Sequence, residues 1–396
     1  MGMQREVVVT SGVRTAVGRF GGALKDMPPT ELGAKVIQEA VSRTGVDPSE
    51  VGHTVFANVI HTDVHDMYMA RVASVNGGLP VETPALTVNR LCGSGLQAIV
   101  SAAQMVTLND CDVAVAGGTE SMSRGAYWVP GARWGERMGD GKLIDATVGA
   151  LTDPFDDCHM GITAENVSEQ WGVSREDQDA FAVQSHQRAA RAQEEGRFDD
   201  QILPLEIKKR KETVTFDTDE HVRANADMEG MAKLKPAFRG DGSVTAGNAA
   251  GVNDGAAAVV LMEREYAEAN GYTPMARLVS YGFAGVEPSV MGVGPIGAIR
   301  QALDRADLKV DDMDTIELNE AFAAQAIAVM RELSLPEDRT NPNGSGISLG
   351  HPIGATGAVL TVKALYELER IEGRYGLVTM CIGGGQGIAA VFERMS

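Results

Sequence analysis

Hydrophobic and polar residues follow one another along the chain in patterns that predict helices and strands in turn. Residues 33–59 (GAKVIQEAVSRTGVDPSEVGHTVFANV) read as an amphipathic helix, an acidic turn and a strand that ends at an Asn. Residues 297–322 (GAIRQALDRADLKVDDMDTIELNEAF) show the same order. This alternation predicts an α/β fold with helices packed on sheets.

Later segments of the chain correspond in the same way. The helix CGSGLQAIVSAAQMV and the strand DVAVAGG after it are echoed by HPIGATGAVLTVKALYEL and GLVTMCIGG. Each half then closes on a similar segment, at 255–265 and 387–395. Three correspondences in one order predict a duplicated α/β fold with two pseudo-symmetric halves.

The repeats also predict the domain organisation. We expect an N-terminal half at 1–120, completed by 250–271, and a C-terminal half at 272–396. The segment between them, 121–249, breaks the alternation and is rich in Met, Trp and charged residues. Such an excursion usually carries ligand or partner contacts, so we expect an inserted loop domain.

Composition narrows the possible partners and the compartment. The chain has 396 residues, enough for more than one hydrophobic core, and a formal net charge of −19. This charge argues against a nucleic-acid or anionic-membrane partner, but not against an anionic small molecule. Four cysteines in a chain of this length form no disulfide framework, which favours the cytoplasm. No uninterrupted apolar run is long enough to span a bilayer.

The stretch NRLCGSGLQA at 89–98 carries the first candidate for chemistry. Cys92 directly precedes a glycine-rich helix start, where the helix dipole and unpaired N–H groups favour a thiolate over a thiol. Gly93 and Gly95 would let a substrate approach the sulfur and a backbone N–H face an oxyanion. A small buried structural cysteine is the alternative on this motif alone.

The second half offers partners for Cys92. His351, in SLGHPIGATGA, precedes a helix start that matches the one after Cys92, and an imidazole can take the thiol proton. Cys381 ends the strand GLVTMC, and Asn319 follows another strand in ELNEAFA. If the halves pack together, these strand and helix ends meet. Two thiols, an imidazole and an amide suit acyl transfer.

The chain resembles the thiolases along its whole length. The matching motifs are NRLCGSGLQA, HMGITAENV, MAKLKPAF, TAGNAAGVNDGAAA, ELNEAFAAQA, GHPIGATGA and CIGGGQG. The residues within and around these motifs look most like those of the broad-specificity β-ketothiolases of bacteria that make polyhydroxyalkanoates. The resemblance implies two halves in a layered αβαβα arrangement, and a short-chain acetyl-CoA C-acyltransferase that makes or cleaves 3-oxoacyl-CoA.

Residue roles follow from this resemblance. Cys92 would take the acyl group with His351 as its base, and Cys381 would remove an α-proton from a second acetyl-CoA. His351 and a water held by Asn319 would form one oxyanion site. The backbone N–H groups of Cys92 and Gly383 would form the other.

The resemblance also implies how CoA binds. Four positions would line its groove, and a fifth would lie near the acyl pocket: His159, Arg223, Phe238 and Ala246, then Met291. Ala250 and Gly230 depart from the family pattern, because some relatives carry a hydroxyl there. CoA thioesters would be substrates, with no cofactor and no metal, and the protein would be a homodimer or a homotetramer assembled through the insert.

Three other interpretations remain weaker. GVGPIG at 292–297 fits a dinucleotide-binding pattern, but Pro295 interrupts it and no clear strand precedes it. His61 and His65 have a spacing that could bind a metal on a helix, without further obvious ligands. A non-catalytic CoA-binding protein with the same fold is the third, and it would release no CoA from acetyl-CoA.

Overall fold

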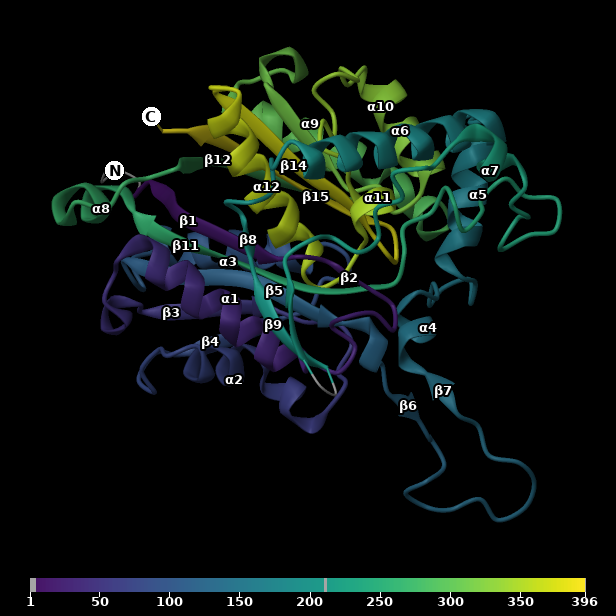
Figure 1. Ribbon diagram of the computed structural model, residues 1–396, viewed down its shortest axis with the longest axis horizontal. Coiled ribbons are helices and arrows are strands. Elements are labelled where there is room, and N and C mark those ends of the chain that lie inside the picture. Colours follow the sequence, from purple (N-terminus) through teal and green to yellow (C-terminus); the bar gives the residue numbers. More distant parts are fainter. Residues whose placement is uncertain (1–4, 210–211, 396) are drawn as a thin grey trace.

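The computed structural model describes residues 5–209 and 212–395. A large mixed sheet runs through the molecule in the order β13-β14-β15-β12-β1-β11-β5-β3-β4, and β2 and β8 pair with β11 and β1 (Figure 1). The strands are β1 Val7–Thr15, β2 Gly18–Arg19, β3 His53–Ala57, β4 Ala85–Val88, β5 Val113–Ser121, β6 Tyr127–Trp128, β7 Ile144–Asp145, β8 Ile202–Leu203, β9 Leu205–Lys209, β10 Glu212–Phe216, β11 Asn253–Glu263, β12 Ala276–Gly285, β13 Thr315–Leu318, β14 Tyr375–Ile382 and β15 Gln386–Arg394.

The helices alternate with these strands through both halves. They are α1 Pro29–Thr44, α2 Met69–Asn76, α3 Ser94–Thr107, α4 Ala146–Ala150, α5 Met160–Gln170, α6 Arg175–Glu194, α7 Met228–Ala232, α8 Arg264–Asn270, α9 Gly294–Ala306, α10 Ala323–Leu333, α11 Gly346–Leu349 and α12 Thr356–Arg370. In the described part of the chain, none has the length and apolar composition needed to cross a bilayer.

The strand order is the same in the two halves. In the first half β3 is parallel to β5, and β5, β11 and β1 are antiparallel neighbours. In the second half β13 is parallel to β14, and β14, β15 and β12 are antiparallel neighbours. The halves join where β1 pairs with β12, at Val8–Arg277 and Val9–Ala276. The predicted duplicated α/β fold is confirmed.

Helices and strands form five layers. One face of the first-half strands packs on α1 and α2, as when Val113 and Val115 of β5 join that core. Ala114 and Ala116 point the other way, into a core shared with α3, α12 and the second-half strands. α9 and α10 cover the far face of the second half. Both faces of the sheet are therefore buried in each half, which explains the continuous apolar runs in the sequence.

The central helices α3 and α12 approach each other closely at their N-terminal turns. A Cβ atom at Gly95 would lie 2.6 Å from the backbone nitrogen of Ala358, and one at Gly357 would lie 2.2 Å from that of Leu96. Glycine is needed at both positions because the opposing atoms are backbone. This contact brings the residues before each helix, Cys92 and His351 among them, toward the middle of the molecule.

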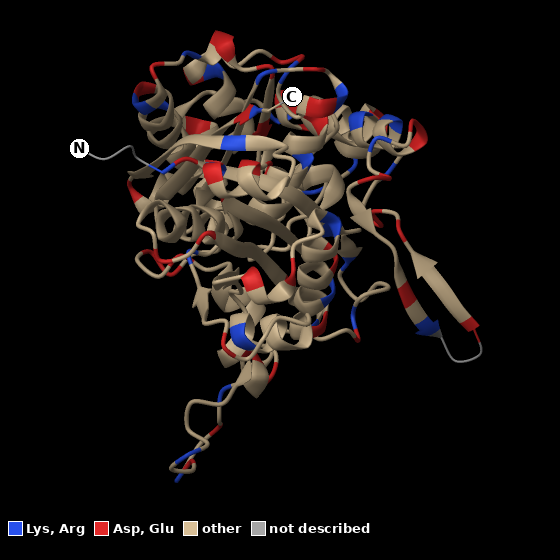
Figure 2. Cartoon of the chain, turned by 90° about the vertical axis from the view of Figure 1, so that its left-hand side faces the viewer, with Lys and Arg blue, Asp and Glu red and all other residues tan. Residues whose placement is uncertain are grey.

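The segment 121–249 holds α4 to α7 and β6 to β10. Its hairpin β6–β7 and the connecting loop extend away from the body (Figure 1). A fully buried ion pair between Arg14 of β1 and Asp219 anchors the segment to the sheet (Nη1–Oδ1 2.7 Å). Charged residues lie mostly on outer helices and loops, while the central strands are largely uncharged (Figure 2). The proposed domain boundaries stay a prediction.

The expectation that no strand precedes the GVGPIG motif is wrong. β12 ends at Gly285, followed by a 3-10 helix, Pro288–Val293, and then by α9. A Cβ at Gly294 would lie 2.1 Å from the carbonyl oxygen of Gln386 in β15. This glycine therefore serves close packing of α9 on the sheet.

Candidate active site

A tight turn holds Cys92 immediately before α3. Leu91 has a φ of 45°, in the left-handed region, which costs about 1–3 kcal/mol for a residue with a side chain. The turn is held by Ser94, whose Oγ donates to the Leu91 carbonyl at 2.6 Å and accepts the Arg90 N–H at 2.7 Å. The strain at Leu91 is concentrated beside the candidate nucleophile, as is typical of functional turns.

The surroundings of Cys92 keep its thiol protonated. The side chain is half-buried and packs against Ile60, Met122, Ala146 and Ile353. Burial raises its pKa to about 11, against the opposing effect of the backbone N–H groups of Gly383 and of Cys92 itself. The expectation of a thiolate favoured by the helix start is wrong for this structure, because burial outweighs the N–H groups. A base must take the proton when the sulfur reacts.

His351 has the form that such a base requires. Its Nδ1 lies 2.7 Å from Thr356 Oγ, and the Thr356 hydroxyl donates to the Pro352 carbonyl at 2.9 Å. The Thr356 oxygen therefore accepts from Nδ1–H, which leaves the lone pair on Nε2. Burial lowers the His351 pKa to about 4, so the ring is neutral at pH 7.

Asn319 and Cys381 lie at the carboxyl ends of two parallel strands, β13 and β14. The Asn319 N–H donates to the Thr379 carbonyl at 3.0 Å, which places Asn319 beside the end of β14. Its Nδ2 lies 3.4 Å from Nε2 of His351, and its buried Oδ1 has no partner among the described residues. Cys381 is fully buried, and burial with the nearby Cys92 raises its pKa. The two thiols therefore share one region.

Three of the predicted CoA residues gather around Cys381. The rings of His159 and Phe238 stack with centroids 4.6 Å apart, and Phe238 meets Phe322 edge-on. Phe238, Phe322 and Met291 belong to the same apolar cluster as Cys381. His159 also caps α5, because its Nδ1 accepts the Gly161 N–H at 3.0 Å.

The other two predicted CoA residues are exposed. Ala246 stands in the turn from Thr245 to Asn248, between buried Val244 and Ala249 of the Cys381 cluster. Arg223 lines a shallow pocket with Phe20 and Val252, and Val252 packs on the Cys92 cluster. Both positions can meet a ligand from solvent, but the contacts within the described residues do not join them to each other.

Gly383 lies directly against the reaction region. Its N–H bonds the Cys92 sulfur, and a Cβ at this position would lie 2.8 Å from Cε of Met160. Gly384 and Gly385 follow with φ values of 81° and 84°, which side chains rarely adopt. The glycine run therefore aims an N–H at the sulfur.

Sequence reasoning missed the residues that hold this arrangement. Asn253 accepts the His351 N–H on its Oδ1 at 3.0 Å, and Thr356 fixes the imidazole. Glu120, at the end of β5, accepts the Gly354 N–H at 2.8 Å. A polar residue at the end of an apolar strand was the available signal at Glu120, in AVAGGTES. It points to a buried polar contact without naming its partner.

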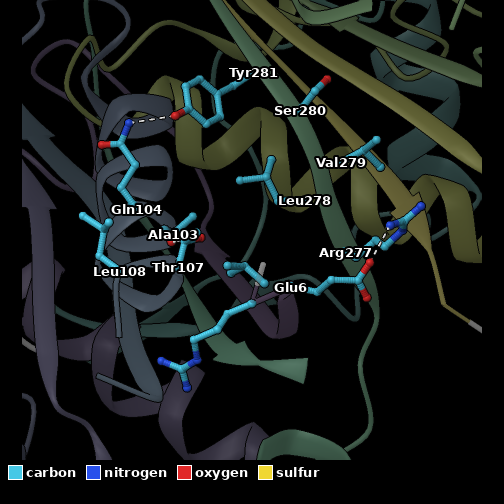
Figure 3. A pocket seen from close by; sticks show the side chains of 12 residues that line it. Glu6, Ala103, Gln104, Thr107, Leu108, Arg277, Leu278, Val279, Ser280 and Tyr281 are labelled. Atoms are coloured by element: carbon cyan, nitrogen blue, oxygen red, sulfur yellow. Dashed lines mark hydrogen bonds and ion pairs between the residues drawn. The ribbon is translucent and has the colours of Figure 1, made fainter. Parts of the chain in front are cut away.

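A pocket on another side of the molecule is not part of this site. It lies at the C-terminal end of α3, opposite Cys92, between α3 and β12 (Figure 3). Its polar groups pair with one another, as when Gln104 donates to the Tyr281 hydroxyl and Arg277 to Glu6 (Figure 3).

Across residues 5–209 and 212–395, no group of three or more His, Cys, Asp and Glu could hold a metal. His61 precedes the short 3-10 helix, Val64–Tyr68, that contains His65.

Comparison with known proteins gives the family. Residues 7–265 match the N-terminal domain of thiolase and residues 272–394 match its C-terminal domain. The chain is 63% identical over 394 residues to beta-ketothiolase BktB of Cupriavidus necator, covering 99% of this chain and all of the relative. It is 50% identical to an acetyl-CoA acetyltransferase of Pseudomonas aeruginosa over 98% of this chain and all of that protein.

Solved structures agree over the full chain. The crystal structure of the Bacillus anthracis acetyl-CoA acetyltransferase superposes with a TM-score of 0.97 at 47% identity, covering 99% of both chains. Human mitochondrial 3-ketoacyl-CoA thiolase in complex with CoA superposes with a TM-score of 0.97 at 42% identity, covering all of both. The chain belongs to the thiolase family and is an enzyme of that family.

Proposed function

We propose that this thiolase is a short-chain acetyl-CoA C-acyltransferase that works through an acyl group on Cys92. The observation that carries the proposal is the neutral, buried imidazole of His351 in the same region as two thiols and the Gly383 N–H. In the first step Cys92 Sγ attacks the thioester carbon and His351 Nε2 takes the thiol proton. The C–S bond to CoA breaks, and the departing thiolate receives that proton.

The second step joins two acyl units. The Cys381 thiol gives its proton to His351, the resulting thiolate removes an α-proton from a second acetyl-CoA, and the carbanion attacks the acyl carbon on Cys92. The bond to the Cys92 sulfur breaks and that sulfur takes the proton held by His351, which restores both thiols and the neutral imidazole and yields a 3-oxoacyl-CoA. Burial supports this role because a thiol with a raised pKa gives a strongly basic thiolate.

Negative charge forms on a thioester oxygen in both steps. We propose that the N–H groups of Cys92 and Gly383 serve the oxygen in one step, since both already face the Cys92 sulfur. His351 and a water held by Asn319 serve the other. The unpartnered Asn319 Oδ1 supports a bound water, because a buried carbonyl oxygen without a hydrogen bond is costly.

Acyl specificity is proposed to be broad among short chains, with CoA held by His159, Arg223, Phe238 and Ala246 and the acyl group near Met291. The similarity to a β-ketothiolase supports this. A thiolysis panel tests it. Acetoacetyl-CoA and 3-oxovaleryl-CoA should both be cleaved, because one methylene in an apolar pocket changes discrimination by about 1–3 kcal/mol. Strict rejection of the five-carbon ester would contradict broad specificity, and a lack of CoA-dependent cleavage of every ester would contradict the activity.

Assembly into a homodimer or homotetramer in the cytoplasm is also proposed. The loop of the β6–β7 hairpin exposes 88% of Trp134 and 95% of Met138, and large apolar side chains exposed together on one projecting loop are a candidate contact surface for a second copy of the chain. Light scattering after size exclusion measures the mass of the particle. The double variant Trp134→Ser, Met138→Ser should lower that mass. An unchanged mass would show that the hairpin is not part of the interface between subunits.

A further inference from the structure

Glu120 lies buried between the two loops that flank the candidate nucleophile and its base. Its side chain is fully inaccessible to solvent. Its oxygens accept the N–H groups of Val59 at 3.1 Å, Ile60 at 3.0 Å and Gly354 at 2.8 Å, and Asn58 Nδ2 at 3.0 Å. One carboxyl group therefore joins a loop of the first half to a loop of the second.

Both loops contact the nucleophile region. Ile60 and Ile353 belong to the apolar cluster against which Cys92 packs. Gly354 follows His351 by three residues and leads directly into α12. A Cβ at Gly354 would lie 2.6 Å from Glu120 Oε2, so the loop has no room to move closer.

Most other hydrogen bonds of the His351 loop stay within the second half: Asn319 and Thr356 contact the imidazole, and the N–H groups of Ala355 and Thr356 donate to the Pro352 carbonyl. The His351 N–H is held by Asn253, and Pro352 has no N–H to donate. The Gly354 N–H is held by Glu120 alone among the bonds of this segment. Loss of the Glu120 contact would therefore remove the hydrogen bond that ties the segment between the imidazole and α12 to the loop at 58–60.

We propose that Glu120 is a positioning residue for acyl transfer, because its carboxyl group fixes the loop carrying His351 against the loop that packs on Cys92. The inference rests on the proposed function of Cys92 and His351. It assigns Glu120 no contact with the substrate. The residue acts by setting where the imidazole stands relative to the sulfur.

The negative charge of Glu120 and its hydrogen bonds have opposite effects on the reaction of Cys92. Burial raises the Glu120 pKa, but three backbone N–H groups and Asn58 Nδ2 occupy both oxygens and leave no acceptor for a carboxyl proton, so the group is held as a carboxylate. When ionised, Glu120 adds to the raised pKa of Cys92 and so disfavours the reactive thiolate. Without the charge of Glu120, Cys92 should react at least as fast with a small alkylating agent. Without the hydrogen bonds of Glu120, the His351 loop should move and acyl transfer should become slower. One variant can separate these effects.

Glu120→Gln is the variant that tests the proposal. Its amide has one acceptor oxygen where the carboxylate has two, so two of the four N–H donors face an NH₂ group and the junction of the loops is weakened at nearly constant volume. Mass spectrometry follows acetylation of Cys92 by acetyl-CoA. Iodoacetamide attacks the small thiolate fraction that is in equilibrium with solvent protons, so its rate reports the pKa and the access of the sulfur and not the placement of His351. We expect acetylation about 100-fold slower, the scale of a 1 Å misplacement, with alkylation no slower and KM changed less than about threefold.

Two further variants complete the experiment. Glu263→Gln removes another buried carboxylate that accepts a backbone N–H, that of Tyr266, away from both loops, and should acetylate at the wild-type rate. Glu120→Asp keeps both oxygens and should acetylate faster than Glu120→Gln. If Glu120→Gln does not fold, the rate of Glu120→Asp relative to wild type decides, and a rate equal to wild type counts against the proposal.

The outcomes separate this inference from the proposed function. A wild-type enzyme that is not acetylated on Cys92 refutes the proposed function. A wild-type enzyme that is acetylated, with folded Glu120→Gln acetylated within about threefold of it, overturns the role of Glu120 alone. Equal slowing of acetylation and alkylation in Glu120→Gln also overturns that role, because it indicates general disruption of the fold.

Discussion

The helix start at Cys92 and the helix start after His351 occupy corresponding places in the two halves, yet they present different chemistry. Cys92 follows Leu91, which has a φ of 45°, and stands two residues before α3, whereas His351 follows Gly350, which has a φ of 108°, and stands five residues before α12. In the first half the turn leaves a half-buried thiol beside α3. In the second it encloses an imidazole that is 5% exposed. Two helix starts joined by one glycine contact thus carry segments of different length, a short one with a half-buried reactant and a longer one with a shielded base.

The largest expected effect tests whether the two thiols differ as proposed. Cys92→Ala should abolish acetylation by acetyl-CoA, because Cys92 is the proposed nucleophile. Cys381→Ala should still form the acetyl-enzyme but lower condensation about 10²–10⁴-fold and lose exchange of the α-hydrogen with solvent. Mass spectrometry after acetyl-CoA treatment distinguishes the variants. An acetyl group on Cys381 in the wild type, or none in Cys381→Ala, would reverse the assignment.

The repeat in the sequence predicted the fold because each half needs the same strands and helices in the same order. DVAVAGG and GLVTMC become β5 and β14, both buried on two faces. The site was only partly predictable. The helix start at Cys92 suggested a thiolate, but packing against Ile60 and Ile353 decides the pKa. Such burial arises from residues far apart in sequence, so a local motif does not reveal it.

The residues that hold the His351 loop could not be predicted from the sequence for a similar reason. Asn253 and Glu120 contact the His351 loop across 98 and 234 residues of chain. Neither residue stands in a motif whose spacing indicates its partner. Strand ends could be read from the sequence, whereas the hydrogen bonds that join them needed the three-dimensional structure.

The second prediction concerns the pH dependence of stability, which should report the burial of three imidazoles. Burial lowers the pKa of His186, His221 and His351 to about 4. The unfolded chain binds protons at these histidines near pH 6.5, before the folded protein does, so stability is full above about pH 6.5 and falls toward pH 4. Each histidine contributes up to about 3 kcal/mol to that loss.

Thermal denaturation from pH 7 to pH 4.5 measures this loss. His221→Gln should flatten the pH dependence of Tm, because one proton-binding site of the unfolded chain is gone. Equal slopes for wild type and His221→Gln would contradict the burial argument.

The third prediction tests the symmetry of the contact between α3 and α12. Gly95→Ala and Gly357→Ala should each destabilise the protein by about 1–3 kcal/mol or more, because the new Cβ meets backbone that cannot rotate away. Chemical denaturation measures the loss. Gly149→Ala in α4 is the control, since a Cβ there meets no atom within 4 Å. A penalty at only one of the two glycines would show that the halves do not share the contact equally.

The smallest expected effect concerns a residue outside both helix starts. Arg223 is exposed in the inserted segment, so its attraction for an anionic ligand is weakened by solvent and is worth about 1 kcal/mol. Arg223→Ala should therefore raise KM for CoA substrates about fivefold and leave kcat nearly unchanged, as expected when ground state and transition state are bound equally. Lys233→Ala removes another exposed cation, one that pairs with Glu229, and should change neither constant. If Arg223→Ala lowers kcat with KM unchanged, the insert acts on the reacting groups as well as on CoA, and the chemistry would no longer belong to the two halves alone.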